Sequence, residues 1–223
     1  IKRKIYMQRI RPFMNTDLIK VFTGIRRAGK SVMLELVKNE LKESGISEEN
    51  FLCINFEQFS NSQFLDVESL YKKITDFQKN TKGRIYLFFD EIQEVDGWEK
   101  CINSCRIDFD CDIYITGSNA KLLSGELATY LAGRYVEFVI YPFSFAEFFE
   151  MNLIKNPNVD KATCFMQFLK TGGMPFLSNF PDDDSAKSQY LIDIYNSVVL
   201  KDVVKRNNIR DVDTLERIVA YAF

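Results

Sequence analysis

The sequence contains no histidine, although it is 223 residues long. Without an imidazole, this chain cannot supply a Ser-His-Asp triad, a Cys-His nucleophile pair or a histidine-ligated zinc ion. Cysteine is present but forms no C-x-x-C pair, and its count is odd, with residues at Cys53, Cys101, Cys105, Cys111 and Cys164. This arrangement favours reduced thiols in a cytoplasmic protein over a disulfide framework.

Long apolar runs and a strong net charge are also missing. No stretch approaches the length of a membrane span and no signal peptide is visible, so we expect no membrane association. The net charge of −2 does not indicate a nucleic-acid-binding protein. The first thirty residues nevertheless carry nine basic side chains and one acid, Asp17. Such a basic N-terminal arm either serves nucleotide or nucleic acid, or is a solvated face.

The most informative stretch is Gly-Ile-Arg-Arg-Ala-Gly-Lys-Ser at residues 24–31, a complete G-x-x-x-x-G-K-[ST] phosphate-binding loop. A strand-like run, 18–22, precedes it and a helix-like run, 31–37, follows it, which is the context that the chemistry requires. Glycines in the loop allow successive amides to converge on a phosphate, and the helix adds the positive end of its dipole. The alternative is an ordinary glycine-rich turn between a strand and a helix.

Within the loop, Lys30 would reach the β- and γ-phosphates, and the Ser31 hydroxyl would ligate Mg²⁺. Arg26 and Arg27 contact phosphate, a partner or only solvent. We expect nucleotide to be bound by the whole loop together with the next residue, that is by Gly24, Ile25, Arg26, Arg27, Ala28, Gly29, Lys30, Ser31 and Val32.

Strand and helix patterns alternate after the loop. Apolar runs predict further strands at 51–56, 84–89, 113–116 and 135–140, and helical spacing predicts helices at 66–79, 98–107 and 120–131. This alternation is typical of an α/β fold with a doubly wound parallel sheet, here of five strands.

Beyond Pro142 the strand patterns stop. Helical spacing continues at 143–152, 161–170 and 187–204, which indicates a small all-helical domain. We therefore divide the chain into a phosphate-loop domain, 1–142, and a helical lid with the start of a further region, 143–223. Because the sequence begins without methionine and stops inside an apolar helical pattern, we expect a fragment of a longer protein.

A carboxylate pair, Asp90-Glu91, follows the apolar run at 84–89. Asp90 would hold Mg²⁺, and Glu91 would orient and deprotonate an attacking water. The alternative is a solvated turn. Glu91 favours hydrolysis over a kinase reaction, and the absence of an Asn-Lys-x-Asp guanine reader favours ATP.

Polar residues also follow the strand at 113–116. Ser118 and Asn119 would sense the γ-phosphate and position water from there. Asn119 has an equally good explanation as the N-cap of the next helix.

Taken in order, these motifs and those that follow resemble a known family. Gly24–Ser31, Asp90-Glu91-Ile92-Gln93, Thr116-Gly117-Ser118-Asn119, Leu131-Ala132-Gly133-Arg134 and Tyr141-Pro142-Phe143-Ser144-Phe145 occur together, over roughly residues 10 to 180. Together they look like the prokaryotic AAA+-type P-loop ATPases related to the archaeal ATPase and STAND groups. Many members carry a C-terminal winged-helix region and a nuclease-like domain, neither of which is complete in this sequence.

The resemblance implies two further site residues. Arg134 matches an arginine that approaches ATP, often from a neighbouring subunit, which would require a homo-oligomer; otherwise it is a surface arginine pairing with Glu126 or Glu137. Pro175 resembles the proline of a Gly-x-Pro lid element that packs near adenine; otherwise Gly172 to Pro175 is a helix-breaking turn.

The leading hypothesis is an ATPase that hydrolyses Mg²⁺-ATP to drive a conformational switch of the lid. Two alternatives remain open. One is a nucleotide-gated module that binds DNA or a protein through the missing C-terminal region, with little hydrolysis. The other is a small-molecule kinase, for which the sequence shows no acceptor pocket.

Overall fold

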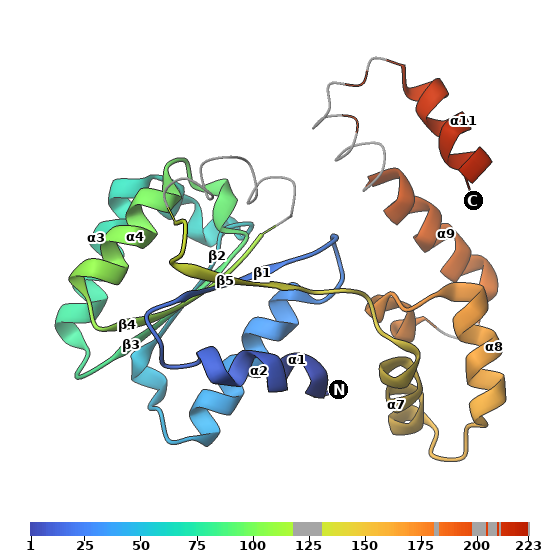
Figure 1. The fold of residues 1–223 in the computed structure, drawn as a ribbon, viewed down its shortest axis with the longest axis horizontal. Helices are drawn as coiled ribbons and strands as arrows, with labels where there is room; N and C mark the ends of the chain where they lie inside the picture. The colour runs from blue at the N-terminus through green and yellow to red at the C-terminus, as the bar shows by residue number, and fades with distance from the viewer. Residues whose placement is uncertain (118–130, 181–182, 198–203, 205–208, 210, 223) are drawn as a thin grey trace. The chain divides into compact units, whose positions relative to one another are not determined.

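The computed structural model describes residues 1–117, 131–180, 183–197, 204, 209 and 211–222. The chain divides into two compact units, Ile1–Pro142 and Phe143–Phe223, which are drawn in Figure 1 and described separately below. The predicted helix at 120–131 lies almost entirely outside the described residues.

The first unit is built on a five-stranded sheet in which every pair of neighbouring strands is parallel. The strand order is β2-β3-β4-β1-β5, so the sequence crosses from one half of the sheet to the other between strands. The strands are β1 (Ile19–Thr23), β2 (Phe51–Asn55), β3 (Ile85–Asp90), β4 (Cys111–Thr116) and β5 (Tyr135–Val139). The predicted five-stranded parallel sheet is confirmed, with strand ends shifted by one or two residues.

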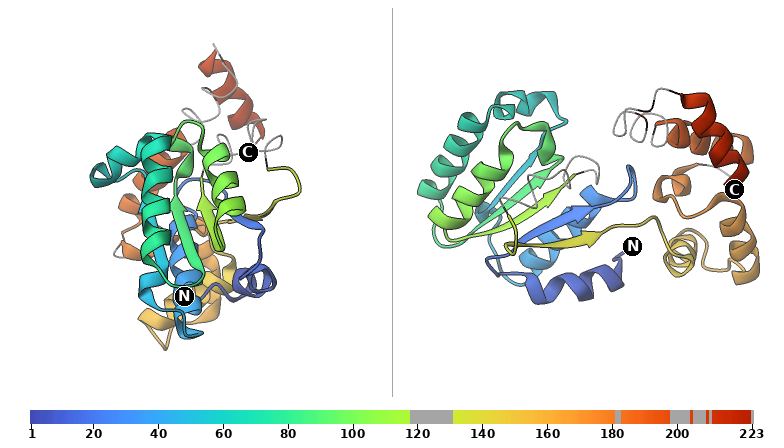
Figure 2. Two further views of the ribbon diagram at one scale, coloured as in Figure 1. Left: turned by 90° about the vertical axis from the view of Figure 1, so that its left-hand side faces the viewer. Right: turned by 45° about the horizontal axis from the view of Figure 1, so that its top comes forward.

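Helices cover both faces of this sheet, as Figure 2 shows. One face is covered by α1 (Lys4–Ile10) and α2 (Lys30–Glu43), and the other by α3 (Val67–Asn80) and α4 (Trp98–Asp108). Short 3-10 segments connect these elements at η1 (Arg11–Phe13), η2 (Glu48–Asn50), η3 (Phe59–Leu65) and η4 (Ile92–Glu94). The arrangement explains why β1, β3 and β4 are buried along their whole length, because each is covered from both sides.

Each face has its own apolar core. Between the sheet and α3–α4 lie Leu70, Ile74 and Trp98 together with the side chains of one face of the strands. Between the sheet and α1–α2 lie Met7, Ile10 and several residues of α2. The N-terminal residues are therefore neither an arm nor a fully solvated face, because α1 packs its apolar side onto the sheet.

A buried ion pair fixes the entry into β1. The Lys20 ammonium and the Asp112 carboxylate are fully buried and in direct contact, and burial lowers the pKa of Lys20 while Asp112 opposes that effect. Lys20 Nζ also donates to the Leu18 carbonyl at 2.7 Å. The other oxygen of Asp112 accepts from the Asn15 backbone amide and the Tyr114 hydroxyl, both at 2.7 Å. Every partner is hydrogen-bonded, as a buried charge requires.

The second unit is helical throughout its described part. It contains α7 (Phe145–Lys155), α8 (Lys161–Thr171), η5 (Pro175–Asn179), α9 (Asp184–Tyr195) and α11 (Val212–Ala222). The third predicted helix, 187–204, starts too late, because Asp183 accepts hydrogen bonds from the amides of Ser185 and Ala186 and so begins the helix at Asp184. Residues 198–203 of that prediction lie outside the described residues.

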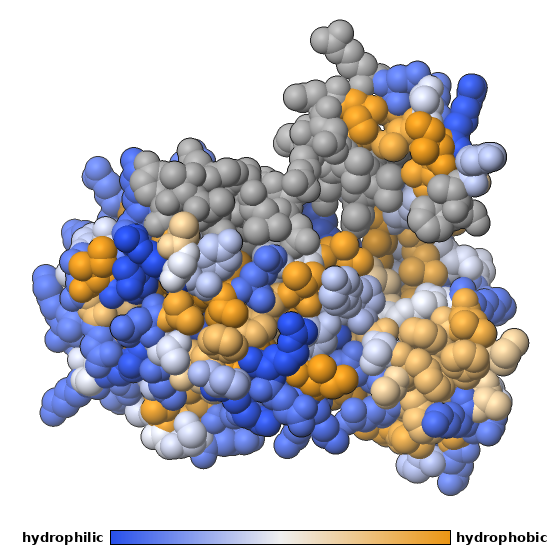
Figure 3. Space-filling view, viewed as in Figure 1, coloured by the Kyte–Doolittle hydropathy of each residue, from blue (hydrophilic) through white to orange (hydrophobic). Residues whose placement is uncertain are grey.

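The start of α7 also differs from the prediction of 143–152. Ser144 and Glu147 form a reciprocal capping box, which fixes the first helical residue at Phe145. Figure 3 shows apolar side chains on the exposed surface of this unit. The exposed apolar residues of α7 and α8 include Ile154, Phe165, Met166 and Leu169. None of the described helices has the length and apolar character needed to cross a bilayer.

Replacing Lys20 by Met should leave Asp112 buried without its counter-ion. We expect the free energy of unfolding to fall by about 3 to 5 kcal/mol, measured by urea denaturation followed by circular dichroism. The matched control is Lys170→Met, because Lys170 pairs with Asp184 on the surface and should contribute little. Equal losses in the two variants would contradict a special role for the buried pair.

Candidate functional site

The phosphate-loop sequence forms a tight turn between β1 and α2. Gly24 and Gly29 have φ angles of 135° and 101°, in the region that side chains disfavour. A Cβ atom on Gly24 would lie 2.1 Å from the Ile140 carbonyl oxygen, so only glycine fits beside β5. Gly29 is the N-cap of α2, so the helix begins at Lys30, inside the motif. The loop therefore ends at a helix N-terminus, the arrangement that favours a bound anion.

Lys30 is almost fully buried and turns back over its own loop. Its ammonium donates to the carbonyls of Gly24 at 3.3 Å and Ile25 at 3.5 Å. The same nitrogen lies 3.7 Å from Oε1 of Glu91. The structure thus brings together the lysine and the glutamate that the sequence assigned to one site.

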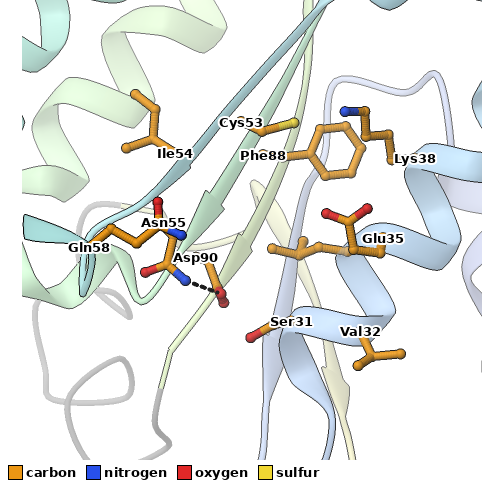
Figure 4. A pocket seen from close by; sticks show the side chains of 11 residues that line it. Ser31, Val32, Glu35, Lys38, Cys53, Ile54, Asn55, Gln58, Phe88 and Asp90 are labelled. Carbon is orange, nitrogen blue, oxygen red and sulfur yellow. Dashed lines mark hydrogen bonds between the residues drawn. The ribbon is translucent and has the colours of Figure 1, made fainter. Parts of the chain in front are cut away.

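Asp90 is the last residue of β3, and its carboxylate is held from both neighbouring strands. Asn55, at the end of β2, donates from Nδ2 to one oxygen at 2.9 Å, as Figure 4 shows. Thr116, at the end of β4, donates from its hydroxyl to the other oxygen. The parallel register pairs Asn55 directly with Asp90. The carboxylate is therefore fixed in direction before any ligand arrives.

Glu91 follows in a left-handed conformation, with φ of 55°. Its backbone amide donates to the Thr116 hydroxyl oxygen at 3.0 Å, and its side chain accepts from Gln93 Nε2 at 2.5 Å. A non-glycine residue rarely adopts this conformation, and such positions gather at functional sites. The turn directs Glu91 toward Lys30 instead of continuing the strand.

A cavity of about 390 Å³ lies beside the first turns of α2. Ser31 and Asp90, the two predicted metal ligands, both line it, and Figure 4 shows their side chains facing the same space. Its other lining residues come from α2, β2, β3 and the segment after β2, and they are Val32, Leu34, Glu35, Lys38, Cys53, Ile54, Asn55, Gln58 and Phe88. The cavity gives solvent and small polar molecules a way to Ser31 and Asp90.

The residues present fit a magnesium ion that is shared with phosphate. No group of three or more Cys, Asp or Glu side chains in the described part of the chain is placed to hold a metal. Mg²⁺ usually takes only one or two protein oxygens and completes its shell with phosphate and water. The hydroxyl of Ser31 and the carboxylate of Asp90 supply such a pair.

The site is acidic on the side of β2. Partial burial raises the pKa of Glu57, and the negative charges of Glu91 and Asp90 raise it further. The charge of Arg26 acts in the opposite direction, which places this loop arginine within electrostatic reach of Glu57. A bound phosphate or cation would therefore change the electrostatic potential at these carboxylates.

Sequence reasoning missed Asn55 and Arg3. Asn55 could have been found as a polar residue at the C-terminal end of a predicted strand, the same signal that identified Asp90. Arg3 was counted only as one charge of a basic arm, and nothing in its neighbours indicates that it is buried. Its exposed fraction is 2%.

The Arg3 guanidinium joins the loop to the end of the first unit. It donates to the Ala28 carbonyl at 3.1 Å and to the Tyr141 carbonyl at 2.9 Å. It also lies over the Tyr6 ring, whose hydroxyl accepts from the Tyr141 amide at 3.0 Å. One cation therefore holds α1, the loop and the residues before Phe143 together.

The structure does not test the roles predicted for four further site residues. Ser118 and Asn119 lie outside the described residues. Pro175 begins η5 in the second unit. Arg134 precedes β5 at the other end of the sheet, because Tyr135 pairs with Ile19 at the start of β1 while the loop follows the end of β1. The roles given to these residues stay predictions.

Arg134 has a described partner that the sequence analysis did not suggest. Its guanidinium donates to Asn103 Oδ1 of α4 at 2.9 Å. Glu137, one of the two acids suggested as its partner, instead accepts from the Thr23 hydroxyl at 2.5 Å. The other, Glu126, lies outside the described residues.

The fold and the geometry of this loop define a P-loop nucleotide-binding protein of the AAA+ type. A family model described as an AAA domain matches residues 16–149, and the chain belongs to that family. The prediction of an AAA+-type domain is confirmed, while the narrower archaeal ATPase and STAND grouping stays a prediction.

Two relatives cover nearly all of this chain. An uncharacterized protein of Haemophilus influenzae is 41% identical over 223 residues, covering 99% of this chain and 55% of that protein. An uncharacterized protein of Methanocaldococcus jannaschii is 34% identical over 228 residues, covering 96% of this chain and 48% of that protein. The chain thus spans about half the length of these curated relatives.

Solved structures share the fold at low sequence identity. AMPPCP-bound DnaA from Aquifex aeolicus has a TM-score of 0.55 at 16% identity, covering 99% of this chain and 68% of that one. A RuvB variant of Thermotoga maritima has a TM-score of 0.53 at 13% identity, covering 95% of this chain and 72% of that one. The Aeropyrum pernix ORC1 protein in complex with DNA has a TM-score of 0.52 at 11% identity, covering 87% of this chain and 66% of that one.

Replacing Arg3 by Met should leave the carbonyls of Ala28 and Tyr141 without their buried donor. We expect the free energy of unfolding to fall by about 1.5 to 3 kcal/mol, and the amides of the loop to exchange hydrogen faster. The control is Arg9→Met, since Arg9 is an exposed arginine of α1, the helix that Arg3 precedes. Unchanged exchange in the loop of the Arg3→Met protein would show that the loop does not depend on this contact.

Proposed function

We propose that this chain binds ATP with Mg²⁺ and hydrolyses it. The observation that carries the proposal is the meeting of Lys30, Ser31, Asp90 and Glu91 at the C-terminal edge of one parallel sheet. Ligands of open α/β sheets bind at this edge, and each residue type matches one requirement of phosphoryl transfer to water. We further propose that the protein works in the cytoplasm.

Each side chain has a separate task in this reaction. Lys30 and the amides of the loop bind the phosphates, while Ser31 and Asp90 hold Mg²⁺, which when bound neutralises charge on the phosphate oxygens. Glu91 orients a water and accepts its proton as the water oxygen bonds to the γ-phosphorus. The bond from that phosphorus to the bridging oxygen breaks, and ADP and phosphate leave. Asn55 and Thr116 keep the Asp90 carboxylate in one direction.

Nucleotide state would be read out through the second unit. We propose that hydrolysis changes the position of the helical unit, with Pro175 near the base, and that Ser118 and Asn119 sense the γ-phosphate. Because the curated relatives are about twice as long as this chain, the partner, DNA or protein, is proposed to bind the region that they have in addition.

The cavity next to Ser31 and Asp90 favours one second candidate, a small-molecule kinase. Its volume of about 390 Å³ would accommodate a small polar acceptor. The sequence had shown no acceptor pocket, so this cavity is the specific reason to keep the candidate. Glu91 distinguishes the two reactions, because a kinase needs no residue to activate water.

Replacing Glu91 by Gln should abolish release of phosphate from ATP while ATP binding is retained, because an amide cannot accept the proton of the water. Binding is measured as a gain in thermal stability with Mg²⁺-ATP, which should reach about 2.7 kcal/mol at a concentration of about 100 Kd. Lys30→Ala should lose that gain. Phosphoryl transfer to an added acceptor by the Glu91→Gln protein would identify a kinase instead.

Arg134 and the phosphate-binding loop of the same chain lie at opposite ends of β1 and β5. A contact of Arg134 with nucleotide would therefore be made at the loop of a neighbouring copy. The Lys30→Ala and Arg134→Ala proteins should each be nearly inactive. Mixed in equal amounts, they should recover about a quarter of the wild-type rate, since one subunit pairing in four joins an intact loop to an intact arginine. A mixture that stays inactive would argue against a shared site.

A further inference from the structure

We propose that Gln93 positions Glu91 for reaction with water, an inference that rests on the proposed ATP hydrolysis. Gln93 lies in η4, the short turn after β3, and its side-chain amide donates to Glu91 Oε2 at 2.5 Å. Gln93 contacts no reacting atom in this role and acts through Glu91.

The backbone explains why a residue only two positions away can reach the carboxylate. The backbone of Glu91 is in the left-handed conformation, with φ of 55°, and Ile92 to Glu94 then form one 3-10 turn. The chain reverses at Glu91, so the side chain of Gln93 returns to the same side. The Thr116 hydroxyl, which accepts from the Glu91 amide, holds this reversal in place.

Two groups hold the Glu91 carboxylate, one on each oxygen. Oε1 lies 3.7 Å from Lys30 Nζ, and Oε2 accepts from Gln93. Lys30 is also the residue that the proposed function gives to the phosphates. It cannot serve both partners fully, so Gln93 is the contact that Glu91 keeps when Lys30 is engaged.

The chemistry of an amide suits this task. A neutral N–H group fixes the direction of one carboxylate oxygen and leaves the charge of Glu91 in place for proton transfer. The other oxygen then faces the water. The opposite amide orientation would set two acceptor oxygens against each other, so Glu91 also determines which way Gln93 points.

A second observation indicates that Gln93 is placed for this contact. Its own carbonyl oxygen is buried and has no hydrogen-bond partner among the described residues. Among the described residues, the side-chain amide of Gln93 therefore makes its hydrogen bond through the N–H group, and that bond goes to Glu91. The position is explained by the bond that Gln93 makes to Glu91.

The first experiment observes the contact without nucleotide. With ¹⁵N-labelled glutamine, the side-chain amide signal of Gln93 is assigned by its loss in the Gln93→Met protein. We expect this signal to lie downfield and to exchange slowly in the wild-type protein, and to move toward the position of a solvated amide in Glu91→Ala. A signal that is the same in both proteins would overturn the inference.

The second experiment separates positioning from binding and from folding. Gln93→Met keeps the volume and removes the donor, while Gln93→Glu places a like charge beside Glu91. We expect kcat for ATP hydrolysis to fall roughly 10- to 100-fold in Gln93→Met and further in Gln93→Glu, because a displaced base acts poorly. The Kd for Mg²⁺-ATP and the melting temperature should stay near wild-type values in Gln93→Met.

The matched control is Gln63→Met, since Gln63 is exposed in η3 and should leave every quantity unchanged. A wild-type protein without ATPase activity would mean that the proposed function fails, and the positioning role with it. An active wild-type protein with an equally active Gln93→Met variant would overturn only the role of Gln93.

Discussion

The parallel pairing of the five strands is the constraint on which the site depends. Because all strands point the same way, β1, β2, β3 and β4 end at one edge, and the residues that follow them meet there. The loop after β1 supplies Lys30, β3 supplies Asp90, and β2 and β4 supply the two hydrogen bonds that hold Asp90. A shift of one residue in the register of β2 would turn Asn55 to the other face of the sheet and remove one of those bonds.

The Lys30 ammonium already has acceptors in the absence of a ligand. Lys30 is buried between its own loop carbonyls and Glu91, so its charge already has acceptors. A phosphate that binds Lys30 would therefore replace hydrogen bonds that the ammonium already makes. Glu91 would lose its counter-ion in the same step. In the proposed reaction, the binding of phosphate would therefore also free the Glu91 carboxylate from Lys30, which links binding to the activation of water.

The sequence was sufficient for the fold because its strands are near-continuous apolar runs with polar residues at their ends. Residues 84–89 and the following Asp90 show both features, and the glycine loop fixed the direction of the first strand. The sequence was insufficient where the burial of a side chain depends on a long-range contact. Arg3 and Ala28 are 25 positions apart, and Arg3 and Tyr141 are 138 apart, so no local pattern distinguishes this buried arginine from its exposed neighbours. The start of α9 was predicted at residue 187 instead of Asp184, because the N-cap Asp183 lies before the helical spacing on which that prediction rested.

Two contacts connect the phosphate-binding loop to the last residues of the first unit. Gly24 lies against the Ile140 carbonyl, too close for any side chain, and Ala28 is joined through Arg3 to Tyr141. The chain then passes from Pro142 to Phe143, whose amide donates to the Gly173 carbonyl at 2.7 Å within the second unit. A Cβ atom on Gly173 would lie 2.0 Å from the Phe143 carbonyl oxygen, so this contact is as tight as that at Gly24. The residues on the two sides of the Pro142–Phe143 junction are therefore each held by a close backbone contact within their own unit.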